Sequence, residues 1–243
     1  MKLLFIRHGD PDYENDSLTE KGVREAALLA ERIANIHIDE CFVSPLGRAR
    51  MTAKPCLEAL KAEAVTYEWL REFDPRIVRP DSPDRTHICW DWLPSDWTKR
   101  EHFYRYDEWW KDDVMEKAKV GKEASYVCDG LDKLLAEHGY ERDGNYYRAV
   151  RPNNDTLAFF CHFGVTMLMI AHLIGASPMV LWHGMVAAPT SITTVYTEER
   201  RKGIASFRVT SFGDVSHLYA AGESPAFSGR FCECLGNEGE RVD

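Results

Sequence analysis

The sequence predicts an α/β protein built as one domain with an insertion. Short apolar runs at residues 3–6, 40–43 and 156–161 are bounded by polar residues and are too short for helices, which is typical of buried strands in a parallel sheet. Helical patterns of apolar residues follow these runs, as βα units require. A chain of 243 residues can bury a sizeable core. We therefore expect a single domain over residues 1–243, with an insertion at about 74–120.

Composition and charge exclude several classes of partner. Hydrophobic residues make up 44% of the chain and charged residues 28%, close to the averages for folded proteins. The net charge of −9 argues against nucleic acid and against an anionic membrane, because both attract basic surfaces. Seven scattered cysteines lack the spacing of a disulfide framework or a zinc site. With no pattern of a signal peptide or membrane span, we expect a cytoplasmic protein.

A polar loop follows the first predicted strand. The segment from residue 10 to residue 22 is rich in turn formers, and Ser17 or Thr19 can cap the helix that begins there. A stripe of apolar residues at helical spacing then extends to about residue 35. This segment is the first βα unit of the predicted sheet.

A second helix starts directly after the strand at residues 40–43. Ser44 can cap this helix, and Pro45 fits its first turn. Arg48 therefore lies in the first turn of a helix at the carboxyl end of a strand. The amide donors and dipole of the helix, together with the guanidinium, favour phosphate oxygens. The sequence thus predicts an anion site at Arg48.

Residues 74–120 interrupt the alternation of strands and helices. Prolines break up the segment, and Trp90, Trp92 and Trp97 add bulk before a pattern that predicts a helix through residues 103–110. The segment is either a lid that supplies aromatic contacts to a substrate or a satellite cluster packed under a long loop. The sequence leaves both interpretations open.

The second half of the chain completes the sheet. The patterns predict a helix at 122–138, a hairpin at 140–150, a strand at 156–161, a helix at 165–174 and an antiparallel pair at 190–196 and 204–212. From residue 220 the chain is rich in Gly, Ser, Glu and Arg, which predicts a loosely ordered tail.

Two histidines occupy matched positions at strand ends. His8 follows the first strand beside Arg7, and His162 follows the strand at residues 156–161, directly before a helix. Open α/β sheets bind ligands at the carboxyl ends of their strands. A lone histidine in such a place is usually a packed core residue, but two in matched contexts, each with an arginine partner, indicate a site.

Acidic residues near these strand ends allow more than one interpretation. Glu72 lies just past a strand predicted at 65–69, in line with the strand-end sites of His8 and Arg48, where a glutamate is more often solvated than catalytic. Asp10 and Asp12 follow His8 at alternate positions, which is also a loose pattern for metal ligands.

With these residues placed, the chain resembles the histidine phosphatase superfamily, in its phosphoglycerate mutase-like branch. The matching motifs are RHG at 7–9, LTEKG at 18–22, SPLGRARMTA at 44–53, LRE at 70–72 and the second histidine, His162. The resemblance implies a mostly parallel sheet with helices on both faces. It also implies His8 as nucleophile, Glu72 as proton donor, His162 as a further catalytic residue, and Arg7, Arg48 and His162 as the phosphate pocket.

The expected function is a metal-independent phosphomonoester hydrolase that acts on a small phosphorylated metabolite through a phosphohistidine. Two arginines and a second histidine can supply the charge that phosphoryl transfer needs, so we expect no metal and no other cofactor. A phosphoglycerate-type mutase, a metal-dependent hydrolase and a non-catalytic phosphate-binding module are the alternatives. The family motif that commonly follows the glutamate is replaced after Glu72 by FDPRIV, which counts against the mutase.

Overall fold

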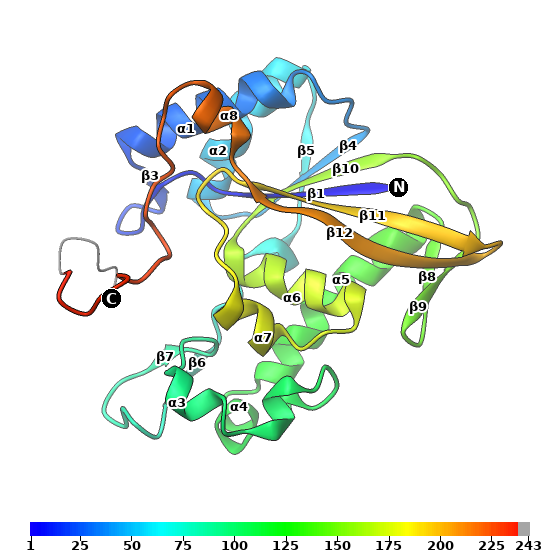
Figure 1. Ribbon diagram of the computed structural model, residues 1–243. Coiled ribbons are helices and arrows are strands. Elements are labelled where there is room, and N and C mark those ends of the chain that lie inside the picture. The colour runs from blue at the N-terminus through cyan, green and yellow to red at the C-terminus, as the bar shows by residue number, and fades with distance from the viewer. Residues whose placement is uncertain (238–243) are drawn as a thin grey trace.

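A single twisted sheet lies between two layers of helices in the structure, a computed structural model that describes residues 1–237 (Figure 1). In the order in which they lie side by side, its strands are β5 (Ala64–Thr66), β4 (Glu40–Val43), β10 (Thr156–Cys161), β1 (Lys2–Arg7), β11 (Ile192–Arg201), β12 (Ile204–Asp214), β9 (Tyr146–Ala149) and β8 (Tyr140–Asp143). One face is covered by α1 (Glu20–Ile33), α2 (Gly47–Leu60) and α8 (Ser216–Ala220), and the other by α5 (Val120–Glu137), α6 (Phe163–Ile174) and α7 (Pro178–Gly184). The predicted α/β architecture with helices on both faces is confirmed.

The sheet is parallel in its core and antiparallel toward one edge. Strands β5, β4, β10 and β1 run parallel, whereas β11 pairs antiparallel with β1 and is followed by β12, β9 and β8. The antiparallel part consists of two hairpins whose turns contain Gly144 and Gly203, with φ of 58° and 78°. The prediction of a mostly parallel sheet therefore holds for the core that carries the strand-end residues.

Strand β1 is fixed by packing on both of its faces. Successive side chains of a strand point to opposite sides, so Leu3 and Phe5 pack in the cluster with α5, α6 and α7, while Leu4 and Ile6 pack with α1 and α2. This double burial sets the position of the residues that follow the strand. It therefore orients the backbone from which the His8 side chain projects.

The N-cap residues of the first two helices agree only in part with the prediction. Thr19 is the N-cap of α1, as one of the two predicted alternatives. The cap position of α2 is Leu46, so the predicted cap by Ser44 is wrong. The hydroxyl of Ser44 lies 2.7 Å from the ring of His162 instead, and residues 44–46 precede the helix, which starts at Gly47.

The strand predicted at residues 65–69 is shorter than expected. Strand β5 ends at Thr66, and the 3₁₀ helix η1 (Glu68–Leu70) follows it. The ring of Trp69 lies against α5 at Gly130, where an added Cβ would be 2.7 Å from the ring, so burial of this indole turns the chain out of the sheet. Glu72 is therefore delivered by a turn after η1, not by the end of a strand.

The Trp-rich segment that the sequence predicted to be an insertion consists of short elements at one end of the molecule (Figure 1). These are β6 (Arg76–Ile77), β7 (His87–Ile88), α3 (Pro94–Trp97), η2 (Glu101–Tyr104), η3 (Trp109–Lys111) and α4 (Asp113–Lys117). The single helix predicted through residues 103–110 is replaced by η2 and η3. Phe103 and Trp109 are buried in the same core cluster as α5, α6 and α7, which anchors this Trp-rich segment to that helical layer.

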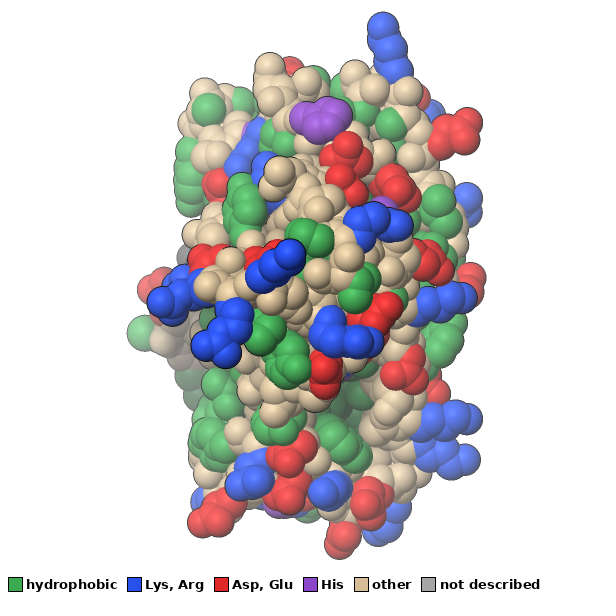
Figure 2. Space-filling view, turned by 90° about the vertical axis from the view of Figure 1, so that its right-hand side faces the viewer, with side chains coloured by type: hydrophobic (Ala, Val, Ile, Leu, Met, Phe, Trp, Pro, Cys, Tyr) green, Lys and Arg blue, Asp and Glu red, His purple; other side chains and the backbone are tan. Residues whose placement is uncertain are grey.

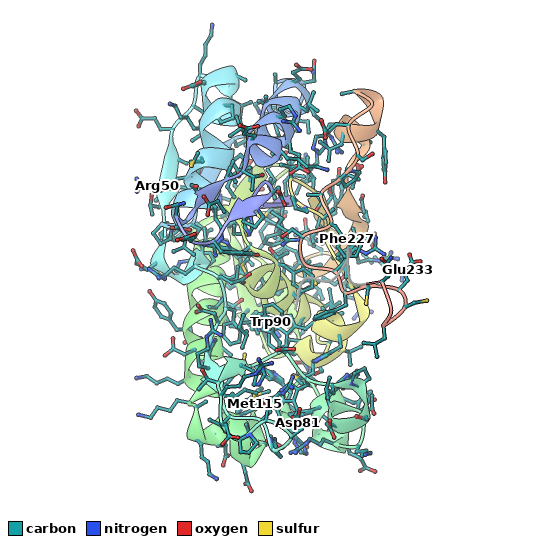
Figure 3. All side chains as sticks on the ribbon, turned by 90° about the vertical axis from the view of Figure 1, so that its left-hand side faces the viewer. Arg50, Asp81, Trp90, Met115, Phe227 and Glu233 are labelled. Carbon is teal, nitrogen blue, oxygen red and sulfur yellow. The ribbon has the colours of Figure 1, made fainter. Side chains whose placement is uncertain are left out.

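The C-terminal segment after α8 returns across the face at the carboxyl ends of the parallel strands (Figure 3). Ala226 in this segment is buried, contrary to the loose tail predicted from residue 220, and residues 238–243 of that prediction lie outside the described residues. The face at the amino ends carries interspersed acidic and basic side chains (Figure 2). In the part of the chain that the structure describes, no helix combines the length and apolarity of a membrane span.

Candidate active site

The two strand-end histidines face each other at the carboxyl edge of neighbouring strands. Strand β1 pairs with β10 so that Arg7 lies opposite Cys161, and the amide of His8 donates to the carbonyl of Cys161 at 3.0 Å. The rings of His8 and His162 have centroids 5.1 Å apart and are both buried. Adjacent parallel strands thus bring residues 154 positions apart in the sequence into contact.

The backbone around His8 selects one tautomer of its ring. Nδ1 lies 2.7 Å from the carbonyl oxygen of Gly9, which can only accept, so Nδ1 carries the hydrogen and Nε2 keeps its lone pair. The amide of Gly9 donates to Thr52 Oγ1 at 2.9 Å, which fixes this loop against α2. Burial and the charge of Arg7 hold the pKa of His8 well below its ordinary value. The side chain is therefore a neutral imidazole near pH 7, and its Nε2 has no hydrogen-bond partner among residues 1–237.

Arg7 is held by one nitrogen of its guanidinium. Nη1 donates to the carbonyl of Ala187 at 2.6 Å and to that of Ser228 at 3.1 Å. Nε is buried and has no hydrogen-bond partner among the described residues. A guanidinium fixed in this way retains a buried donor for an anion.

Arg48 lies in the first turn of α2, as predicted, and is also held through Nη1. Asp16 Oδ1 accepts from this nitrogen at 2.6 Å, and Asp16 Oδ2 accepts from the amide of Gly47 at the start of the helix, also at 2.6 Å. Nε of Arg48 is buried without a partner in the described part of the chain. An aspartate from the loop after β1 thus binds the helix terminus that the sequence assigned to a ligand, and one donor of Arg48 stays unpaired.

His162 has one ring nitrogen bound and one unpaired. The amide of Leu46 donates to Ser44 Oγ at 3.3 Å, and the same hydroxyl lies 2.7 Å from His162 Nε2. When Ser44 donates to Nε2, the ring hydrogen resides on Nδ1, which is buried without a partner within residues 1–237. Burial and the nearby His8 hold the pKa of His162 well below its ordinary value, so this ring is neutral and can donate through Nδ1.

Glu72 is bound to the amino end of α6. Its Oε1 accepts from the amides of Phe73 and Val165 at 2.8 and 3.0 Å. An added Cβ on Gly164 would lie 2.7 Å from this oxygen and 2.8 Å from Nε1 of Trp90, so only a glycine fits beside the carboxylate. Burial raises the pKa of Glu72 against the opposing effect of the backbone amides. A carboxyl group with a raised pKa can hold a proton closer to neutral pH.

The structure brings all five predicted site residues to one edge of the sheet. The charges of Arg7 and Arg48 both lower the pKa of each histidine, and Arg7 also acts on Glu72, so these groups are electrostatically coupled. Sequence reasoning missed three features: Asp16 on Arg48, Ser44 on His162, and the C-terminal contact with Arg7. Only the SPLGRA motif pointed to any of them, and it assigned Ser44 a different role.

The aspartates considered as metal ligands make hydrogen bonds within their own loop. Asp10 Oδ2 accepts from Thr19 Oγ1 at 2.7 Å, and Asp12 Oδ2 accepts from Asn15 Nδ2 at 2.8 Å. Within residues 1–237, no three His, Cys, Asp or Glu side chains form a group that could hold a metal ion.

A pair of neutral histidines beside two arginines, at the carboxyl edge of a parallel sheet, is the arrangement expected of an anion-binding α/β protein. A model of the histidine phosphatase superfamily (branch 1) matches residues 3–210. The chain belongs to this superfamily, as the motifs predicted.

Individual relatives are distant, and the share of the chain that they match differs. Phosphoserine phosphatase 1 of Hydrogenobacter thermophilus is 24% identical over 221 residues, or 86% of this chain and 93% of the relative. A probable phosphoglycerate mutase of Proteus mirabilis is 32% identical, but only over 87 residues, or 32% of this chain and 40% of the relative. The structure of a phosphoserine phosphatase mutant from Entamoeba histolytica with bound phosphoserine has a TM-score of 0.56 at 21% identity, with 89% of this chain and 98% of that chain covered. This likeness supports the fold.

Proposed function

We propose that the protein is a metal-independent phosphomonoester hydrolase that acts on a small phosphorylated metabolite through a phosphohistidine on His8. The observation that carries the proposal is the set of buried polar atoms without a partner among the described residues that surround His8: Nε of Arg7, Nε of Arg48 and Nδ1 of His162. Buried donors without partners cost free energy. A bound phosphoryl group would accept from all three.

The first chemical step follows from the tautomer of His8. Nε2 attacks phosphorus while Nδ1 stays hydrogen-bonded to the carbonyl of Gly9, which stabilises the imidazolium character that develops on phosphorylation. Arg7, Arg48 and His162 bind the equatorial oxygens of the phosphoryl group, whose charge is spread over all three in the transition state. This arrangement supplies positive charge and donors in fixed positions, which is the main requirement of the reaction.

Glu72 protonates the leaving alkoxide. Its Oε1 is occupied by backbone amides, so Oε2 is the oxygen that carries the proton. A substrate dianion would raise the pKa of Glu72 further through like-charge repulsion. The resulting carboxylate can then accept a proton from the water that hydrolyses the phosphohistidine, which returns the site to its starting state.

Hydrolysis is favoured over a mutase reaction by the extent of the matches. A phosphoserine phosphatase matches over 86% of the chain, whereas the probable mutase matches only 87 residues. A mutase must also shield its phosphohistidine from water. In this chain the motif that the family commonly has after the glutamate is replaced by a segment that leads into the insertion, which counts against a mutase. Phe163 is a second departure, since the family often has a glycine after the second histidine.

We further propose that the insertion is a wall of the substrate site within a single domain. Trp90 supports this role, because its indole Nε1 donates to the carbonyl of Phe73 at 2.7 Å and its ring makes an edge contact with Phe163. Both neighbours adjoin Glu72 or His162 in the sequence. The aromatic face of Trp90 would then contact the part of the substrate that leaves as an alcohol. A cytoplasmic location, where phosphorylated metabolites occur, agrees with this function.

Phosphate release from a panel of phosphorylated metabolites, with phosphoserine and 3-phosphoglycerate included, tests the proposal. Hydrolysis should persist after dialysis against a chelator, and a brief incubation with radiolabelled substrate should leave an acid-labile label on the protein that is absent from His8→Ala. Transfer of the phosphoryl group between positions of phosphoglycerate without net release would identify a mutase. Phosphate binding without turnover of any substrate would identify a non-catalytic module, and activity that requires an added divalent ion would refute the metal-independent reaction.

A further inference from the structure

Glu25 on α1 is a buried carboxylate that takes no part in the proposed chemistry. It is 0% exposed, and its oxygens accept from two backbone amides that are distant in sequence. Oε2 accepts from Asp10 at 2.9 Å, and Oε1 accepts from Ala226 at 3.0 Å. A carboxylate is costly to bury unless its lone pairs are satisfied, so these two bonds are what allow it there. A single side chain thus ties the loop after His8 to the C-terminal segment.

The C-terminal segment in turn contacts Arg7 through its backbone. We call residues 226–229 the C-terminal strap. The carbonyl of Ser228 accepts from Arg7 Nη1, and Gly229 packs so closely on the guanidinium that an added Cβ would lie 3.0 Å from Nη1. The strap therefore provides one of the two carbonyls that hold Arg7, and the other belongs to Ala187. Figure 3 shows Phe227 of the strap on the face that carries the site.

We propose that the C-terminal strap positions Arg7 for the phosphoryl group and that Glu25 is the positioning residue that holds the strap in place. This inference rests on the proposed function, in which Arg7 binds the phosphoryl group. Because two carbonyls bind Nη1, the guanidinium can rotate little. Its buried Nε is not used by either carbonyl and stays available to an anion. When the strap detaches, Arg7 keeps only the carbonyl of Ala187. Part of the binding free energy of the anion is then used to order the Arg7 side chain, so the affinity for the anion falls.

Two full-length variants break the link that Glu25 makes between the amides of Asp10 and Ala226. Glu25→Gln keeps the size of the side chain but has one acceptor oxygen for two backbone amides. Its NH₂ group therefore faces the N–H of Asp10 or of Ala226, and that hydrogen bond is lost. Ala226→Pro keeps the carboxylate and removes the backbone N–H. Glu31→Gln on the same helix is the matched control, because Glu31 is exposed. Circular dichroism and thermal unfolding establish that each variant is folded.

The measurements are the inhibition constant of inorganic phosphate, kcat and KM on an accepted phosphomonoester, and the rate of trypsin cleavage after Arg230, which follows the strap. We expect each strap variant to raise the inhibition constant about tenfold, the factor for one lost hydrogen bond to a charged group. KM should rise in parallel and kcat should change less, while cleavage after Arg230 accelerates. The double variant should be no worse than either single variant, because each substitution alone already breaks the link between the loop after His8 and the strap.

The outcomes separate this inference from the proposed function. Folded strap variants with an unchanged inhibition constant for phosphate would overturn the role of the strap, and so would effects that add in the double variant. Parallel changes in Glu31→Gln would show a general effect of charge on α1 and also overturn it. If the wild-type protein hydrolyses no phosphomonoester, the proposed function fails, whereas phosphate affinity and trypsin cleavage still test whether Glu25 and the strap position Arg7.

Discussion

Replacement of Glu72 by glutamine isolates the proton-donor role from the structural role of this side chain. Glutamine keeps a carbonyl oxygen at Oε1, which can still accept from the amides of Phe73 and Val165. Its amide nitrogen replaces Oε2 and cannot supply a proton to a leaving group. The variant should therefore retain the start of α6 and its thermal stability while it loses general acid catalysis.

The expected loss depends on the leaving group. General acid catalysis contributes about 10²- to 10⁴-fold, or about 3 to 5 kcal/mol of barrier, when an alkoxide must leave. Glu72→Gln should lower kcat/KM by this factor on an alkyl phosphate such as phosphoserine. On nitrophenyl phosphate, whose phenolate leaves without a proton, the loss should stay below about tenfold.

The pH profile provides a second readout of the same variant. Burial raises the pKa of Glu72, so the wild-type rate on an alkyl phosphate should fall on the alkaline side as this group loses its proton. The alkaline limb should be absent from Glu72→Gln. Equal losses on alkyl and aryl substrates, or an unchanged alkaline limb, would show that Glu72 only supports α6, and the proton would then have to come from another acid.

Three further predictions concern the phosphate pocket. His8→Ala should lower kcat by several powers of ten and retain the native circular dichroism spectrum, and substantial turnover by the folded variant would remove His8 as nucleophile. Arg48→Lys should weaken inhibition by phosphate and vanadate, because an ammonium cannot bind Asp16 and the anion with the fork geometry of a guanidinium; unchanged affinity for both anions would place Arg48 outside the pocket. The free energy of unfolding should fall as the pH drops below about 6.5, by up to about 1.4 kcal/mol per pH unit for each buried histidine, because the unfolded state binds protons that folded His8 and His162 exclude. Urea titrations from pH 7.5 to pH 5 measure this slope, and a flat profile would mean that both rings take up protons as readily in the folded protein as in the unfolded chain.

The residues at the site were predictable because strand ends have fixed positions in an α/β sheet. Apolar runs located β1 and β10, and the ends of these strands predicted His8 and His162 at the same edge of the sheet; that the two strands are neighbours is a finding of the structure. Arg48 was found by the same logic, since a helix that starts after a strand points its first turn at this edge. The antiparallel half of the sheet was less evident, because periodicity predicts hairpins but not the strand beside which they pair.

What the sequence could not predict depends on single side chains that redirect the backbone. Burial of Trp69 against Gly130 shortens β5, so the turn that delivers Glu72 comes from a tertiary contact and not from a local pattern. Serine is a common helix cap, yet the hydroxyl of Ser44 forms a hydrogen bond with His162, which is 118 positions away in the sequence. Local propensity is silent about a partner at that separation. The same holds for the bond between Ala226 and Glu25, in a tail whose composition suggested disorder.

Both arginines of the pocket are tethered through Nη1, and the tethers differ in charge. Arg7 is held by neutral carbonyls and Arg48 by the carboxylate of Asp16, so the full charge of Arg7 acts on its surroundings while Asp16 offsets part of that of Arg48. In both cases a buried Nε remains without a partner among residues 1–237. The two guanidinium groups are thus oriented before a ligand binds, which lowers the entropic cost of binding. The carbonyl of Ser228, in a segment that the sequence predicted to be loosely ordered, thus helps to orient Arg7, the arginine next to His8.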